Sequence, residues 1–186
     1  SLAAFIAAPA AGHVNVCAVF DNEEVGSLSK QGADSTLLGD VLTRALCALG
    51  LSDAQIRAAL AASFMVSADN AHAVHPAHPE KSDPGNRPYL NEGIVLKYNA
   101  AQNYCTDGLS GAMFKDICRR ADVPYQVFTN RSDRRGGSTL GNLSTAQVPF
   151  PTVDLGLPQL AMHAPYEMGG TKDTLYLKRA MQLFFA

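Results

Sequence analysis

Apolar and polar positions follow two alternating spacings along the chain, one typical of strands and the other typical of helices. Short apolar runs predict strands over 64–69, 94–98, 125–130 and 152–156. Apolar residues three or four positions apart predict helices over 37–49, 52–60, 106–120 and 173–185. Strands and helices that alternate in this way predict one layered α/β domain over residues 1–186.

The first eleven residues are apolar and end in small residues, as a signal peptide does. They lack a basic region and an initiator methionine, and they are too short to span a bilayer. We therefore interpret residues 1–11 as the end of a helix. A helix that is cut at its first residue indicates the C-terminal part of a longer protein.

The segment 14–20 is apolar and is followed by three carboxylates, Asp21, Glu23 and Glu24. Its composition predicts a buried strand, and acids at the end of a buried strand require a cation or a solvent-filled site. Neighbouring side chains of an extended segment point to opposite sides. Glu23 and Glu24 would therefore approach a site differently, one as a metal ligand and one towards a water. The alternative is a strand that ends in a solvated acidic loop.

A second apolar run ends at Asp69, and three histidines follow it, His72, His75 and His78. Parallel strands that end in acids would meet at one edge of a sheet, where α/β proteins place their sites. The histidines form either a functional loop beside Asp69 or an ordinary hydrogen-bonded surface.

Glu24, Asp69 and His163 each lie near the end of an apolar segment, with Glu23 as a spare carboxylate. Carboxylate oxygens and an imidazole nitrogen suit zinc or another borderline divalent ion. A further carboxylate suits a base for a metal-bound water. This set of residue types predicts hydrolytic metal chemistry.

Two other places could meet an anion. Lys97 interrupts the apolar strand 94–98, so it lies either on a solvent face or in a site for an anionic ligand. The loop 131–141 combines glycines and hydroxyls with Arg131, Arg134 and Arg135, which suits an anion or a carboxylate.

Composition excludes several classes of protein. A net charge of -2 argues against nucleic acid as a partner, and no segment predicts a membrane span. The four cysteines form no CxxC pair and lie mainly in apolar runs: Cys17, Cys47, Cys105 and Cys118. We therefore expect reduced, buried thiols in a cytoplasmic protein rather than disulfides.

Four motifs together resemble the aspartyl aminopeptidase family of dinuclear zinc exopeptidases, in order over nearly all 186 residues. They are Phe20–Ser27 (FDNEEVGS), Ser67–Pro76 (SADNAHAVHP), Gly137–Gly141 (GSTLG) and Pro158–His163 (PQLAMH). The resemblance implies a three-layer domain with a mixed, mostly parallel sheet flanked by helices. It also implies an enzyme that uses two zinc ions to remove N-terminal, preferably acidic, residues from peptides, and a homo-oligomer.

By the same resemblance, Glu23 corresponds to the general base. Glu24 and His163 correspond to ligands of one zinc, and Asp69 corresponds to a ligand of the other.

The resemblance also implies a substrate pocket that contains Lys97, Tyr104 and His72. A lysine in a concave site is a sensible partner for an Asp or Glu side chain of the substrate. It could instead bind only the charge that develops during the reaction.

Family members carry an upstream His-x-Asp, a bridging Asp and an inserted oligomerisation domain, and none of these has a match in this sequence. The 186 residues therefore resemble the C-terminal part of the catalytic domain, with no second domain, and we expect that they could be inactive alone. The alternatives are a non-catalytic structural or assembly fragment and a related zinc amidohydrolase.

Overall fold

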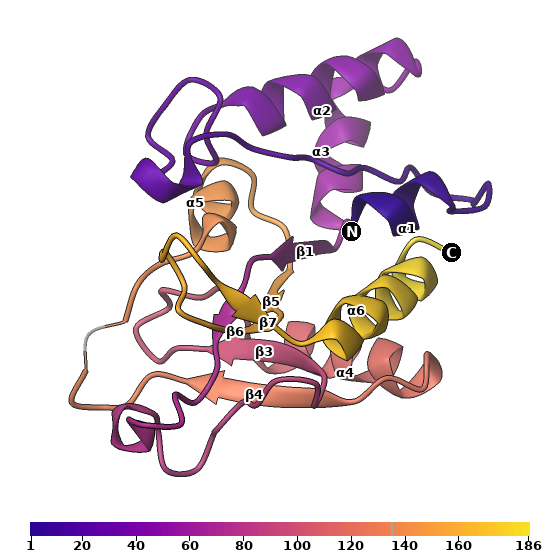
Figure 1. Cartoon of the computed structure of the whole chain (residues 1–186). Coiled ribbons are helices and arrows are strands. Elements are labelled where there is room, and N and C mark those ends of the chain that lie inside the picture. The colour runs from indigo at the N-terminus through magenta and orange to yellow at the C-terminus, as the bar shows by residue number, and fades with distance from the viewer. Residues whose placement is uncertain (135) are drawn as a thin grey trace.

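A four-stranded sheet forms the centre of the molecule (Figure 1). Its strands, in the order β1-β5-β3-β4, are β1 (Met65–Ala68), β5 (Thr152–Gly156), β3 (Ile94–Tyr98) and β4 (Tyr125–Thr129). β1 and β5 are parallel, as are β3 and β4, whereas β5 and β3 are antiparallel. The sheet is therefore mixed and mostly parallel, as predicted. The computed structural model describes residues 1–134 and 136–186.

Three very short strands form a second sheet beside the first, in the order β2-β6-β7. They are β2 (Ala71–His72), β6 (Pro158–Leu160) and β7 (Met168–Gly169). β2 continues the chain from β1 and β6 continues it from β5, so the second sheet extends the parallel pair of the first. The sequence did not predict these strands, because two or three residues are too few to show a period.

Six α-helices and two short 3₁₀ turns complete the described elements. They are α1 (Leu2–Ile6), η1 (Glu23–Val25), α2 (Leu37–Ala48), α3 (Asp53–Ala61), η2 (Pro79–Lys81), α4 (Gly108–Arg120), α5 (Leu140–Gln147) and α6 (Thr171–Phe184). Ser52 and Gln55 form a capping box at the start of α3. Asp107 caps α4 by accepting the backbone N–H of Ser110 at 2.7 Å.

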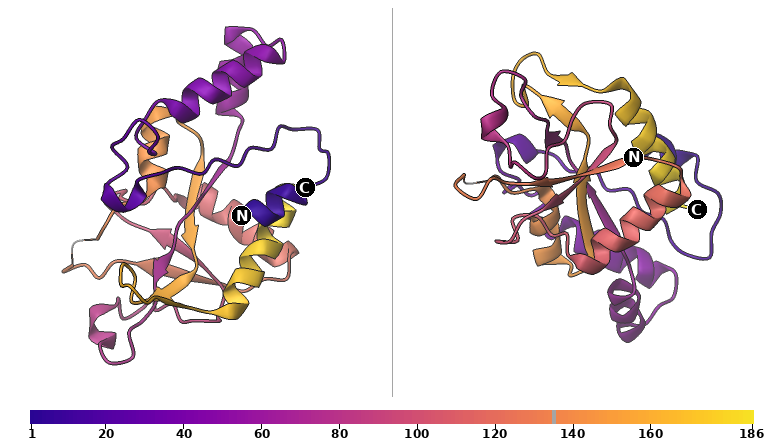
Figure 2. Two further views of the ribbon diagram at one scale, coloured as in Figure 1. Left: turned by 45° about the horizontal axis from the view of Figure 1, so that its top comes forward. Right: turned by 90° about the horizontal axis from the view of Figure 1, so that it is seen from below.

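The central sheet separates an apolar side from a polar side, because successive residues of a strand point to opposite faces. Leu96 and Leu155 pack with α1, α4 and α6 in the main hydrophobic core. Lys97 follows Leu96 in β3, and Asp154 precedes Leu155 in β5. Both therefore face the other side of the sheet, where α5 lies against β1 and β5. Figure 2 shows the helices distributed on both sides of the sheet. The functional candidates lie on the polar side.

The predicted strand over residues 14–20 is wrong. No strand forms there, and Val14 and Val19 are 62% and 80% exposed. An alternating segment becomes a strand only when it finds an edge to pair with, and this segment pairs with none of the strands in the part of the chain that the structure describes. In Figure 1 it runs as an extended loop from α1 to η1, below α2.

The spacing of apolar residues identified the helices correctly but not always their buried faces. Leu37 and Val41 of α2 are exposed, as is Leu49 directly after it, and α2 with α3 projects away from the sheet (Figure 2). In α4 the apolar residues Leu109 and Met113 are exposed. The interior of α4 is formed instead by other residues, among them Ser110, Phe114 and Cys118. Sequence spacing defines a helix face, but only its neighbours decide whether that face is covered.

The four cysteines are all free, in agreement with the expectation of reduced thiols. Only Cys118 is fully buried, and its burial raises the pKa of the thiol to about 12. Cys47 is exposed, which corrects the expectation that all four are buried. Among the residues that the structure describes, no helix combines the length and the apolar character needed to cross a membrane.

Asp173, in the first turn of α6, fastens this helix to the chain that leads into β3. Its buried carboxylate accepts the backbone N–H groups of Asn91 at 2.6 Å and Gly93 at 2.9 Å. Asp173→Ala leaves both groups without this partner. We expect the free energy of unfolding to fall by about 2–4 kcal/mol, measured by urea denaturation.

Asp116→Ala is the matched control, because Asp116 is a half-buried helical aspartate whose ion pairs, among the described residues, are with surface arginines. We expect it to change the free energy of unfolding by less than about 0.5 kcal/mol. Equal effects of the two substitutions would contradict the role of Asp173.

Candidate metal centre and active-site cleft

One cleft of about 270 Å³ lies on the polar side of the sheet. The seven side chains that the sequence assigned to the general base, the metal ligands and the substrate pocket line it. These are Glu23, Glu24, Asp69, His72, Lys97, Tyr104 and His163. Segments separated by up to 140 positions in the chain therefore meet at one place, although their roles do not follow from their positions alone.

Glu23 and Glu24 lie on the 3₁₀ turn η1 rather than on the extended segment that was predicted. The turn is flanked by two left-handed residues, Asn22 with φ 61° and Gly26 with φ 101°. Asparagine and glycine are the residues that tolerate this conformation best. The backbone N–H of Ser27 closes the turn by donating to the carbonyl of Asn22 at 2.8 Å. Both carboxylates therefore reach the same cleft from adjacent positions.

His163 is positioned by a tight turn that follows β6. Its φ of 68° is unusual for a residue with a side chain. Its backbone N–H donates to Oε1 of Glu167 at 2.7 Å, which holds the turn. In this position, Nε2 of the His163 ring lies 3.1 Å from Oε2 of Glu24. A carboxylate oxygen and an imidazole nitrogen from opposite halves of the chain thus face each other.

Lys97 is a buried cation, only 2% exposed, which resolves the two alternatives left by the sequence in favour of the interior. Its ammonium group lies 3.4 Å from Oδ2 of Asp69 and donates to the carbonyl of Asn70 at 3.1 Å. It also lies 5.4 Å from the centre of the Tyr104 ring. These contacts compensate the charge that burial would otherwise destabilise.

Aromatic and amide groups close the cleft beyond Lys97. Tyr104 packs against Phe128, with ring centres 6.2 Å apart, and both are buried. Burial raises the pKa of the Tyr104 phenol, and a hydrogen bond with Asn130 partly opposes that rise. Asn130 in turn accepts a hydrogen bond from Asn99 at 3.0 Å. This end of the cleft is therefore a buried wall with one positive charge.

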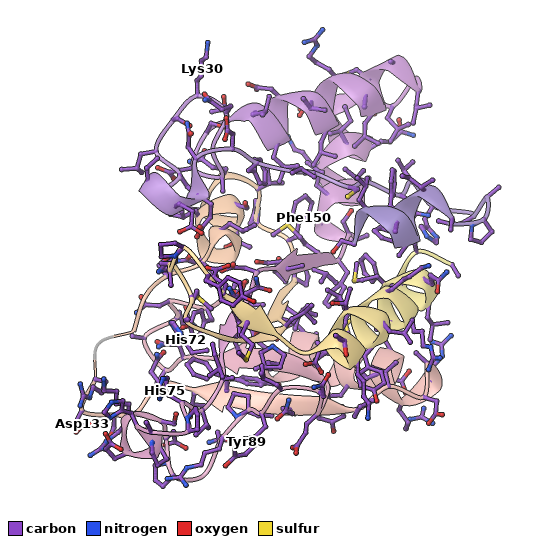
Figure 3. All side chains as sticks on the ribbon, in the orientation of Figure 1. Lys30, His72, His75, Tyr89, Asp133 and Phe150 are labelled. Carbon is purple, nitrogen blue, oxygen red and sulfur yellow. The ribbon has the colours of Figure 1, made fainter. Side chains whose placement is uncertain are left out.

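His72 is the one histidine of the predicted cluster that reaches the cleft. Burial, reinforced by the positive charges of His163 and Lys97, lowers its pKa, so the ring is neutral at pH 7. His75 and His78 lie outside the cleft lining, with ring centres 5.3 Å apart. Figure 3 shows His75 beyond His72 along the loop that leaves the sheet.

Electrostatics distinguish Glu23 from the other acids of the cleft. Partial burial raises its pKa, and the negative charges of Asp69 and Glu24 raise it further. His163 and Lys97 act in the opposite direction. A carboxylate with a raised pKa is a stronger base, which suits a group that must accept a proton.

The pair of Glu24 and His163 supplies two donors of the types that zinc accepts. A zinc site takes about four ligands, with water as the fourth in catalytic centres. Over 1–134 and 136–186 no three His, Cys, Asp or Glu side chains are grouped so that they could hold one ion. The residues present therefore fit part of a zinc site, with Asp69 held nearby by Lys97.

Several cleft residues were not predicted from the sequence. Asn130 follows the end of β4, a position where polar residues often serve a site, so this signal was available. Gln159 lies within an apolar stretch and Glu167 in an irregular loop, so neither carries a local signal.

The glycine-rich loop predicted to hold an anion contributes Gly136, Gly137 and further residues to the cleft. Arg131 instead pairs with Asp133 at 2.7 Å and donates to the carbonyl of Glu80. Arg135, which belongs to the same prediction, lies outside the described residues.

Comparison with known proteins assigns the chain to a family. The description "Aminopeptidase I zinc metalloprotease (M18)" belongs to the family model that matches residues 3–185. A relative from Clostridium acetobutylicum, named "Probable M18 family aminopeptidase 2", is 47% identical over 184 residues, which are 99% of this chain and 42% of the relative. The chain thus spans less than half the length of this relative.

Solved structures agree. A cryo-EM structure of the Ape4 and Nbr1 complex matches with a TM-score of 0.84 at 42% identity, covering 87% of this chain and 31% of that one. The mApe1 dodecamer of S. cerevisiae matches with a TM-score of 0.75 at 29% identity, covering 89% and 36%. Because the family model matches almost the whole chain, this chain belongs to the M18 family of zinc metalloproteases.

Proposed function

We propose that the protein to which these residues belong is a zinc aminopeptidase that releases N-terminal Asp or Glu residues from peptides. In this proposal residues 1–186 are the C-terminal part of its catalytic domain. The observation that carries it is the arrangement of one cleft, in which a basic carboxylate, Glu23, lies beside the Glu24–His163 pair and across from buried Lys97.

Glu23 is the proposed general base. Its raised pKa and its place beside two metal-ligand candidates suit removal of a proton from the attacking water. The same carboxyl group then returns the proton to the amine of the departing peptide.

Glu24 and His163 are proposed ligands of one zinc ion, and Asp69 is a proposed ligand of a second. Zinc, when bound, would lower the pKa of a water and polarise the peptide carbonyl. Asp69 would need to exchange its contact with Lys97 for contact with a metal. The distance of 3.4 Å between Asp69 and Lys97 is longer than a tight ion pair, which favours such an exchange.

Lys97 is the proposed partner of the acidic side chain of the substrate, with Tyr104 and His72 as further walls of the pocket. A buried ammonium discriminates between a charged and an apolar side chain, because only the charged one can form a further charge-assisted hydrogen bond with it. Neutral His72 adds a hydrogen-bonding group without adding charge.

We further propose that the intact enzyme is a homo-oligomer in the cytoplasm. The related mApe1 of S. cerevisiae is a dodecamer. Four free cysteines agree with a reducing compartment.

The general-base role is tested by Glu23→Gln in the full-length enzyme. We expect turnover of an Asp-initiated peptide to fall by roughly 10²–10⁴-fold, because proton transfer is lost while the side-chain volume is kept. Zinc content, measured by atomic emission, should stay nearly constant. Glu167→Gln is a matched control at the cleft rim and should retain far more activity.

Unchanged turnover in Glu23→Gln would remove Glu23 from this role. Absence of both zinc and Asp release in the unaltered full-length protein would instead favour the non-catalytic alternative. Release of N-acyl amino acids but not of N-terminal residues would favour the amidohydrolase.

The raised pKa of Glu23 can be measured directly by carboxyl NMR titration of the metal-free chain. We expect a value above 4.5 for Glu23. Lys97→Met should raise it further, because the positive charge of Lys97 lowers it in the unaltered protein. Lys115→Met, a change on α4, should leave it unchanged, and a fall in Lys97→Met would contradict the electrostatic assignment.

The same substitution tests substrate preference. In Lys97→Met we expect the ratio of kcat/KM for Asp over Ala peptides to fall by about 10- to 100-fold, since a charge-assisted hydrogen bond is lost. If both substrates slowed equally, Lys97 would act on the developing charge rather than on the acidic side chain.

A further inference from the structure

A second hollow adjoins the cleft. It measures about 370 Å³ and lies between β6 and the first turn of α6. Three residues, Asn70, Gln159 and Glu167, line both hollows. The two hollows are therefore adjacent, and these residues form the rim that they share.

Gln159 is the central group of this rim. It is only 7% exposed and lies opposite His72 in the parallel register of β2 and β6. Its backbone carbonyl is used by the N–H of Ala73 at 2.9 Å. Its side-chain amide carries two donors and an acceptor, so it can form hydrogen bonds with the backbone of a peptide in the adjoining hollow.

The strand beside the hollow has a bare edge. β7 is the outer strand of the sheet β2-β6-β7, and no described strand pairs with its far side. Met168 and Gly169 are exposed, and a side chain added at Gly169 would meet nothing within 4 Å. The edge of a short strand offers backbone N–H and C=O groups to an extended peptide.

The cleft and the second hollow differ in how far they are closed. At one end, buried Lys97, Tyr104 and Phe128 form a closed wall. At the other, the hollow beside β7 is open and lined mainly by small or polar residues, among them Gly169, Gly170, Thr171 and Thr174. A peptide whose first side chain rests against the closed wall therefore has its continuing chain directed past Gln159.

We propose that the groove between β7 and α6 binds the residues of a substrate peptide that follow the cleaved bond, with the Gln159 amide as a contact to their backbone. This inference rests on the proposed function, which it extends from the first residue of the peptide to the next two or three. It assigns the groove to extended peptides of small or polar sequence rather than to single amino acids.

Binding is tested first in the chain of 186 residues, without any need for turnover. The ligands are an aspartyl tetrapeptide with alanines at the other positions and a reduced first peptide bond, and aspartic acid amide. We expect the tetrapeptide, but not the single residue, to shift the amide NMR signals of Gly169, Gly170 and the Gln159 side chain. Shifts confined to the cleft, or no shifts, would overturn the proposal.

Two neighbouring positions on α6 provide a matched pair of variants. Thr174 and Leu175 are both exposed, but only Thr174 lines the groove. We expect Thr174→Trp to weaken binding of the tetrapeptide by about fivefold or more, the equivalent of one lost hydrogen bond. Leu175→Trp should leave it unchanged, and neither should alter binding of aspartic acid amide. Equal effects of the two variants would overturn the proposal.

Failure of this inference and failure of the proposed function give different results. In the full-length enzyme, Asp release at a kcat/KM that is independent of peptide length and of Thr174→Trp would uphold the aminopeptidase and overturn the groove. Length-dependent binding without any Asp release would uphold the groove and overturn the catalytic proposal.

Discussion

The buried ammonium group of Lys97 is the constraint on which the cleft depends. A charge at 2% exposure is costly unless the surrounding structure compensates it. The compensation comes from Asp69 and the carbonyl of Asn70, which follow β1, and from the ring of Tyr104, which lies in the loop before α4. One charge thus fixes the mutual position of three chain segments, and those segments are the walls of the candidate site.

The two faces of the central sheet divide stability from chemistry. Leu96 and Leu155 belong to the apolar core, while their neighbours Lys97 and Asp154 lie on the opposite face. Asp154 is fully buried and accepts the backbone N–H of Cys105 at 2.7 Å, which anchors the loop that carries Tyr104. Packing of the apolar face of the sheet therefore determines where the polar groups of the candidate site lie on the opposite face.

Left-handed backbone conformations occur at both places where the candidate metal ligands Glu24 and His163 enter the cleft. Asn22 and Gly26 flank the turn of Glu23 and Glu24, and His163 itself has a positive φ. A left-handed conformation at a residue with a side chain costs on the order of 1–3 kcal/mol. At His163 this cost is offset in part by the hydrogen bond from its backbone N–H to Glu167. The ring is thereby held against Glu24 rather than left to a mobile loop.

Much of the architecture could be predicted from local sequence. The strands β1, β3, β4 and β5 and the helices α2, α3, α4 and α6 arise from apolar runs and helical spacing, which are properties of neighbouring residues. The site residues were also within reach, because acids and a histidine that end apolar segments are unusual unless they share a site. Their meeting in one cleft agrees with that expectation.

Tertiary structure alone decided which segments found partners. The apolar segment 14–20 has the composition of a strand but pairs with no described strand, and α2 has an apolar face that is largely exposed. The sequence left open whether Lys97 is buried, and it carried no signal for the position of Gln159 between two hollows. The sequence by itself determined the elements and the chemical groups, because both depend on the spacing of nearby residues. Pairing, burial and the shape of the cleft depend on contacts between distant residues, which only the folded chain brings together.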